Sequence, residues 1–153
     1  LLSRRQRQMC IRDSLFNDLV RFIGDDFSPV RPELCKEYPT NYCIRQQING
    51  KFSIRTYIDM PESTCIAFAS RYVNEDFHSF DEYVQSSLED FLNLHNGLFN
   101  VNMSNEQGLE LQLDVPNVVT DELVTFEHEA YMLPIVYSFG TIHFIFELIH
   151  NEL

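Results

Sequence analysis

Two side chains with useful chemistry, Asp90 and Asn93, lie three residues apart in the stretch SFDEYVQSSLEDFLNLHNGLF, residues 79–99. A carboxylate can pair with a cation, and a carboxamide offers one acceptor and two donors. A spacing of three puts both groups on one face of a helix, within reach of one site. Gly97 follows on the same side, where its missing side chain would let another backbone approach closely.

The helix that must position this pair has an apolar stripe on another side. At 100° per residue, the stripe lies well away from Asp90 and Asn93, so we expect it to be buried. It comprises Val84, Leu88, Phe91, Leu92, His95, Leu98 and Phe99. Ser79 and Glu82 fit a capping box, which predicts that the helix begins at Ser79 and runs for about nineteen residues.

The same residues also have an ordinary interpretation. An acid and an asparagine on the solvent-facing side of a helix are common, and alone they indicate no site. Gly97 could equally be the residue that ends a helix after Asn96, because glycine readily adopts the left-handed conformation found there.

The net charge of the chain limits its partners. The formal net charge is −12, and after Arg71 the chain has no Lys or Arg but fifteen acidic residues. A surface of this sign repels nucleic acid and anionic membranes, so we expect neither as a partner. It suits a partner that offers a basic rim. The longest apolar stretch, Leu133 to Ile149, contains His143 and Glu147 and does not fit a membrane span.

The cysteines and histidines indicate no metal or disulfide framework. Cys35, Cys43 and Cys65 form no CxxC pair, and their odd number fits free thiols in a reducing compartment, hence a cytoplasmic protein. The five histidines form no H-x-x-H pattern. We expect His95 to be a hydrogen-bonded core residue and His143 to lie on the solvent-facing side of a sheet.

The first residues differ in kind from the rest. Arg4 to Ser14 back-translate without a break to a transposon adapter used in sequencing libraries, so we expect residues 1–14 to be artefactual. Residues 15–40 then read as the end of a truncated N-terminal helix followed by a linker rich in Pro, Gly and Asp. The domain itself is expected over residues 41–150.

The remaining pattern predicts an α+β domain. Alternating residues on both sides of Asn49-Gly50 predict a β-hairpin, with both turn residues tolerating positive φ. Pro61 predicts the start of a helix that runs to about Val73. Three further alternating segments predict strands at 109–115, 125–133 and 141–149, with Pro134 confining the second to an edge or a break. We therefore expect an antiparallel or mixed sheet with helices packed on one face.

Acid-x-x-Asn followed by Gly four residues later resembles the E-x-x-N motif of the CheX/CheC class of chemotaxis phosphatases. The order of elements over residues 40–149 is similar too. A hairpin precedes the motif helix, a VNMSN segment follows it, and LELQLDVPNVV then closes on a proline and two valines.

That resemblance implies a CheX-like fold and a function in a chemotaxis or two-component pathway. The implied substrate is the phosphoaspartate of a receiver domain of the CheY type, which brings its own Mg²⁺, so the chain needs no cofactor. By position, Asn93 would orient the attacking water and Asp90 would pair with the active-site lysine of the receiver. Tyr83, Ser86, Leu94 and Gly97 would contact the partner.

The chain departs from the family at the acid, which is Asp and not Glu and so is shorter by one methylene. Glu89 is adjacent but points in another direction. A second hypothesis is therefore a non-catalytic regulatory or dimerisation module that keeps the receiver-binding helix. An unrelated α/β binding domain is the third. A homodimer through an open edge strand remains an alternative to a monomer.

Overall fold

The structure, a computed structural model, describes residues 2–149. The helices are α1 (Arg4–Phe22), α2 (Glu62–Val73) and α3 (Glu82–Gln107). The strands are β1 (Phe27–Pro29), β2 (Glu33–Pro39), β3 (Tyr42–Asn49), β4 (Ser53–Met60), β5 (Gln112–Leu113), β6 (Asn117–Thr120), β7 (Leu123–Tyr137) and β8 (Gly140–Ile149).

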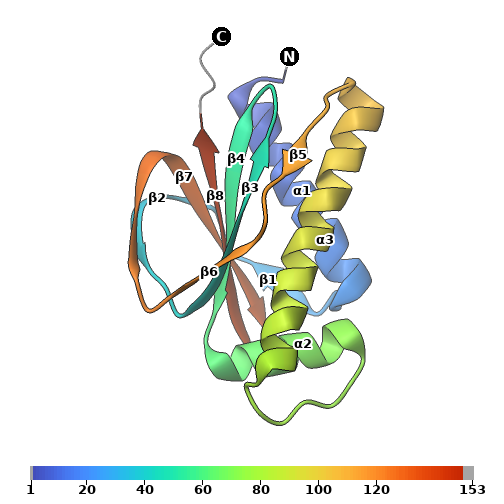
Figure 1. Cartoon of the computed structure of the whole chain (residues 1–153), viewed down its shortest axis with the longest axis vertical. Coiled ribbons are helices and arrows are strands. Elements are labelled where there is room, and N and C mark those ends of the chain that lie inside the picture. The colour runs from blue at the N-terminus through green and yellow to red at the C-terminus, as the bar shows by residue number, and fades with distance from the viewer. Residues whose placement is uncertain (1, 150–153) are drawn as a thin grey trace.

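One antiparallel sheet joins the strands in the order β1-β7-β8-β4-β3-β5, with β2 paired to β7 and β6 paired to β3. Helices α1 and α3 lie side by side on one face of this sheet, and α2 crosses one end (Figure 1). The prediction of an antiparallel sheet with helices on one face is confirmed.

The predicted hairpin is formed by β3 and β4, with Ile44 opposite Ile58 and Ile48 opposite Ile54. The expected reason for its glycine was wrong, because Gly50 is not among the residues with positive φ. A side chain at Gly50 would instead place its Cβ 2.8 Å from the carbonyl oxygen of Glu110. Close approach of another backbone, and not turn conformation, requires glycine here.

Helix α2 follows Pro61, which is its N-cap, and ends before Asn74 in the left-handed conformation. Helix α3 begins at Glu82, three residues later than predicted. Its cap is Asp81, whose carboxylate accepts hydrogen bonds from the backbone N–H groups of Tyr83 and Val84. The capping box that starts at Ser79 was therefore wrong: a carboxylate nearer the helix satisfies the free N–H groups.

Helix α3 is also longer than expected, at 26 residues, and ends at Gly108, whose φ of 64° suits a C-cap. The VNMSN segment is part of the helix. Gly97 consequently lies in the middle of α3, and the interpretation of Gly97 as a helix terminator is excluded.

The main core lies between the helices and the sheet. The α3 residues Leu88, Phe91 and Leu92 are fully buried there. His95 is also buried, and its Nδ1 lies 2.5 Å from the Asp18 carboxylate of α1, which confirms it as a hydrogen-bonded core residue. Residues 4–14, left out of the sequence-based fold prediction, form the first part of α1 and bury Ile11.

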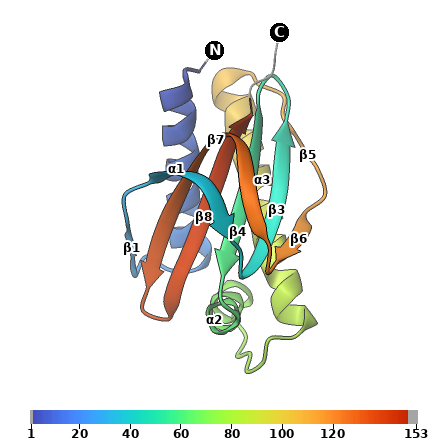
Figure 2. The ribbon, with the colours of Figure 1, turned by 90° about the vertical axis from the view of Figure 1, so that its left-hand side faces the viewer.

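A second, smaller core covers part of the opposite face, where β2 and the first part of β7 pass in front of β3 and β4 (Figure 2). Its buried members are Tyr38, Cys43, Tyr57, Val119, Phe126, Ala130 and Ile145. The side of the sheet away from the helices, expected to face solvent, is therefore partly buried in this region. His143, expected on that side, is half-buried, and burial lowers its pKa.

Three local predictions also need correction. The expected linker contains β1 and β2, and the strand expected at 109–115 is reduced to Gln112–Leu113. Pro134 does not lie at an edge, because β7 continues through it between β1 and β8.

Candidate functional site

Asp90 lies on the exposed side of α3, as the helical spacing predicts. Its Oδ2 accepts a hydrogen bond of 2.6 Å from the hydroxyl of Tyr72, which comes from α2. Burial and this hydrogen bond both raise the pKa of Tyr72 above its ordinary value, so the hydroxyl remains a donor at neutral pH. Within residues 2–149, no hydrogen bond engages the other oxygen, Oδ1, which is left for a partner.

A hollow of 390 Å³ lies beside Asp90 at the junction of α2 and α3. It is lined by Tyr72, Val73, Glu75, Phe77, Tyr83, Ser86, Ser87 and Asp90. The structure thus brings Asp90 together with two of the predicted partner-binding residues, Tyr83 and Ser86. Tyr83 is 67% exposed, so its ring is accessible to a partner.

Asn93 lies one turn further along α3 and is also exposed. Its Oδ1 accepts a hydrogen bond of 2.8 Å from the Nε2 of Gln46, on β3 beneath the helix. Gln46 is only 1% exposed. The side-chain oxygen of Asn93 is therefore held toward the interior of the protein. Its amide nitrogen donates no hydrogen bond within the described part of the chain.

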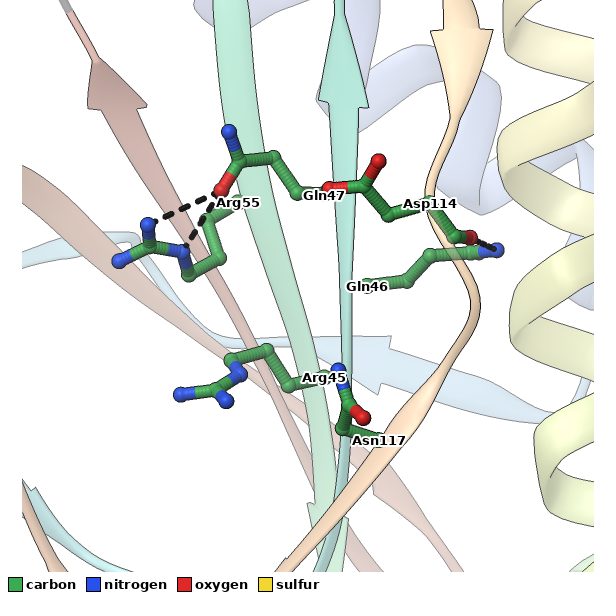
Figure 3. A pocket seen from close by; sticks show the side chains of 6 residues that line it. All are labelled: Arg45, Gln46, Gln47, Arg55, Asp114 and Asn117. Atoms are coloured by element: carbon green, nitrogen blue, oxygen red, sulfur yellow. Dashed lines mark hydrogen bonds between the residues drawn. The ribbon is translucent and has the colours of Figure 1, made fainter.

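Gln46 belongs to a buried polar network that sequence analysis missed. Its Nε2 also donates to the backbone carbonyl of Asp114 at 2.9 Å (Figure 3). Its Oε1 accepts from Asn96 at 2.9 Å, and Asn96 donates as well to the hydroxyl of Thr56. A signal for this network was available, since Gln46 interrupts the apolar positions of the alternating strand between Ile44 and Ile48.

The other two predicted partner-binding residues, Leu94 and Gly97, are half-buried on α3. Within the part of the chain that the structure describes, a Cβ added at Gly97 would meet only the Cδ1 of Leu113, at 4.0 Å. The space next to Gly97 is therefore open. Asp90, Asn93 and Gly97 thus form an accessible stripe along α3, with Gly97 at the end nearest β5.

A polar pocket of 220 Å³ lies where β3 faces the link from β5 to β6, lined by Arg45, Gln46, Gln47, Arg55, Asp114 and Asn117. Figure 3 shows Arg45 and Arg55 extending away from the helix, whereas Gln46 reaches toward it. Arg55 is already engaged by Glu147 at 3.2 Å and by the Oε1 of Gln47. The pocket therefore shares Gln46 and Asp114 with the network beneath α3, while its two arginines extend away from the helix.

Two features that would indicate other kinds of function are absent from residues 2–149. No three His, Cys, Asp or Glu side chains in that range converge as a metal site would require. No helix in the same range combines the length and the apolar character needed to cross a bilayer.

Comparison with protein families identifies the chain. The family described as chemotaxis phosphatase CheX matches residues 42–140, which is more than half of the sequence. The chain belongs to the CheX family. The matched residues include the hairpin, α2, the Asp90–Asn93 helix and most of the sheet. No curated protein sequence matches the chain.

Solved structures show the same fold at low sequence identity. The structure of a CheX–CheY–BeF3–Mg²⁺ complex from Borrelia burgdorferi matches with a TM-score of 0.80 and 17% identity, over 94% of this chain and 97% of that one. A CheC-like superfamily protein from Shewanella sp. PV-4 matches with a TM-score of 0.78 and 19% identity, over 94% and 97%. The chemotaxis protein CheX from Desulfovibrio desulfuricans matches with a TM-score of 0.76 and 15% identity, over 92% and 97%.

Proposed function

We propose that this CheX domain hydrolyses the phosphoaspartate of a CheY-type receiver protein in the cytoplasm. The observation that carries the proposal is the placement of Asp90 and Asn93, both exposed on one face of α3 while its apolar stripe is buried. The structure of a CheX–CheY complex from another organism supports a receiver as the partner.

The reaction needs a water in line with the bond between phosphorus and the aspartyl oxygen. The water oxygen attacks phosphorus, the P–O bond to the receiver aspartate breaks, and inorganic phosphate leaves. Most of the barrier is lowered by positioning and charge stabilisation, and the receiver contributes its own Mg²⁺. Asn93 would orient the water through its exposed amide, which needs no change of protonation.

Asp90 would fix the register of docking by pairing with the active-site lysine of the receiver. Its Oδ2 is held by Tyr72, and its Oδ1, which accepts no hydrogen bond within the described residues, would meet the cation. The hollow beside it, lined by Tyr83 and Ser86, would receive the neighbouring surface of the receiver. The acidic character of the chain favours association with a basic rim.

A specific observation also favours the second candidate, a receiver-binding module without turnover. Asp90 is one methylene shorter than the glutamate of the family motif, and Tyr72 holds it against its own domain. Misplacement of a catalytic contact by about 1 Å can cost about two decades in rate.

One experiment separates the two candidates. A receiver is charged with a small-molecule phosphodonor, the domain is added at substoichiometric concentration, and loss of phosphoaspartate is followed over time. Turnover that disappears in Asn93→Ala supports the phosphatase. Binding without acceleration supports the module, and Asp90→Glu should then restore turnover. A domain that neither binds nor accelerates any of several receivers would refute both.

A further inference from the structure

In the buried network beneath α3, the groups at the two ends determine which atom donates and which accepts in each hydrogen bond. At one end is the backbone carbonyl of Asp114, which can only accept a hydrogen bond. The Gln46 amide must therefore turn its Nε2 toward Asp114, where the distance is 2.9 Å. The second hydrogen on Nε2 is then directed to Asn93, which must offer its oxygen, at 2.8 Å.

The other end of the network is fixed in the same way. The hydroxyl of Thr56 donates to the backbone carbonyl of Gln46 at 3.0 Å, so toward Asn96 it can only accept. Asn96 meets this requirement with its Nδ2, which donates to both Thr56 and the Oε1 of Gln46. Two backbone carbonyls thus determine the orientation of every amide in the network.

Asn96 adds an independent indication that the network serves a purpose beyond stability. Its side-chain oxygen is buried and accepts no hydrogen bond within the described residues. A buried acceptor without a partner is destabilising, and an apolar residue of similar shape would avoid that cost. Gln46 and Asn96 are each only 1% exposed, so neither can contact a partner protein directly.

We propose that Gln46 is a positioning residue that determines which atom of the Asn93 carboxamide faces the receiver. With Oδ1 held by Gln46, the amide N–H groups of Asn93 point outward, and the side chain presents donors to the reaction centre. An unrestrained asparagine would present either end, because its two orientations have nearly the same shape. The inference rests on the proposed function for its kinetic test, but the geometry can be tested without a receiver.

The kinetic test compares Gln46→Met with Gln47→Met. Methionine has a similar length and removes only the hydrogen bonds. Gln47 is the neighbouring strand residue on the opposite face, bonded to Arg55, and serves as the matched control. We expect Gln46→Met to lower kcat about tenfold with KM unchanged within about twofold, and Gln47→Met to leave both unchanged. An unchanged kcat in Gln46→Met would overturn the proposal.

The double variant Gln46→Met/Asn93→Ala distinguishes positioning from general structural support. If Gln46 acts through Asn93, its substitution has no further effect once Asn93 is gone. An additional loss of similar size in the Asn93→Ala background would show that Gln46 acts elsewhere, and the proposal would fail.

A measurement on the free domain tests the geometry of Gln46 and Asn93 without depending on phosphatase activity. Side-chain amide resonances are assigned by NMR, and exchange of their protons with water is measured. We expect slow exchange for the Gln46 Nε2 protons and fast exchange for those of Asn93. This pattern supports the geometry even if the domain shows no turnover, an outcome that would count against the proposed function alone. Fast exchange at Gln46 would refute the positioning role.

Discussion

The two motif side chains of α3 are held in different ways. Asn93 is bonded to the fully buried Gln46, whose amide donates to the backbone carbonyl of Asp114 and accepts from Asn96. Among residues 2–149, Asp90 is held only by the hydroxyl of Tyr72, at the edge of an open hollow. Asn93, which is proposed to orient the water, is therefore held rigidly. Asp90, which is proposed to contact the partner, is held less tightly and can move. A reacting group must be placed within a fraction of an ångström, whereas a docking contact can adapt as two surfaces meet.

The largest expected difference between Asn93 and Asp90 is in the kinetic effect of replacing each with alanine. Asn93→Ala should lower kcat by about two orders of magnitude or more and leave the half-saturating receiver concentration nearly unchanged. Asp90→Ala should mainly raise the half-saturating concentration, by about tenfold, because it removes a charge pair across the interface. Initial rates of phosphoaspartate loss, measured with substoichiometric domain over a range of phosphorylated receiver concentrations, give both quantities. Equal effects of the two substitutions on both quantities would contradict the division of roles.

Gly97→Ala tests whether the receiver approaches α3 closely at this position. Alanine is favoured over glycine in a helix by about 0.5–1 kcal/mol, and among the described residues its Cβ would meet nothing nearer than 4.0 Å. We expect the melting temperature to rise by about 2–3 °C while the half-saturating receiver concentration rises about fivefold. Ser104→Ala, at an exposed position of α3 far from the motif, is the control. Unchanged receiver binding by Gly97→Ala would show that the partner does not approach there.

Tyr72→Phe tests whether the hydrogen bond to Asp90 affects receiver binding alone. The substitution removes one hydrogen bond and keeps the ring, so we expect the half-saturating concentration to rise about threefold and kcat to remain the same. Fluorescence titration of a labelled receiver and the turnover assay together measure this effect. A fall in kcat comparable to that of Gln46→Met would mean that both supports serve the reacting group.

The smallest effect is expected from pH. A carboxamide does not titrate, and the pKa of Tyr72 is raised above its ordinary value near 10 by burial and by Asp90. A group with a raised pKa stabilises the folded state below its unfolded pKa, and that stabilisation is lost only as pH rises through the folded pKa. The ratio of rates with wild-type domain and with Asn93→Ala should thus be constant within about twofold from about pH 6.5 to 9. A bell-shaped ratio within this range would indicate a titrating catalytic group instead of Asn93.

Local sequence patterns predicted the elements whose determinants are close together. The β3–β4 hairpin, α2 and β8 follow from alternation, helix signals and turns within a few residues. The exposed position of Asp90 and Asn93 follows from helical spacing alone. Their catalytic and partner-binding roles remain predictions, because these depend on a second protein.

The sequence analysis missed elements and contacts whose partners lie far away along the chain. Strand β2 pairs with β7, so Glu33 meets Met132 across most of the chain, and nothing within residues 24–41 indicates that pairing. The sequence 109–115 alternates well, but β6 pairs with Tyr42–Arg45 of β3, and β5 pairs with Ile48 and Asn49 alone. Gln46 escaped notice for the same reason, since its partners Asn93 and Asp114 lie 47 and 68 residues away.

The contact between Gln46 and Asp114 has an evolutionary consequence, because it engages a main-chain oxygen and not a side chain. Every amino acid carries that oxygen, so position 114 can drift to other residues while the anchor for Asn93 survives. Related domains aligned by residue type would then look unconstrained at this point, although the path of the link between β5 and β6 is what they would have to preserve.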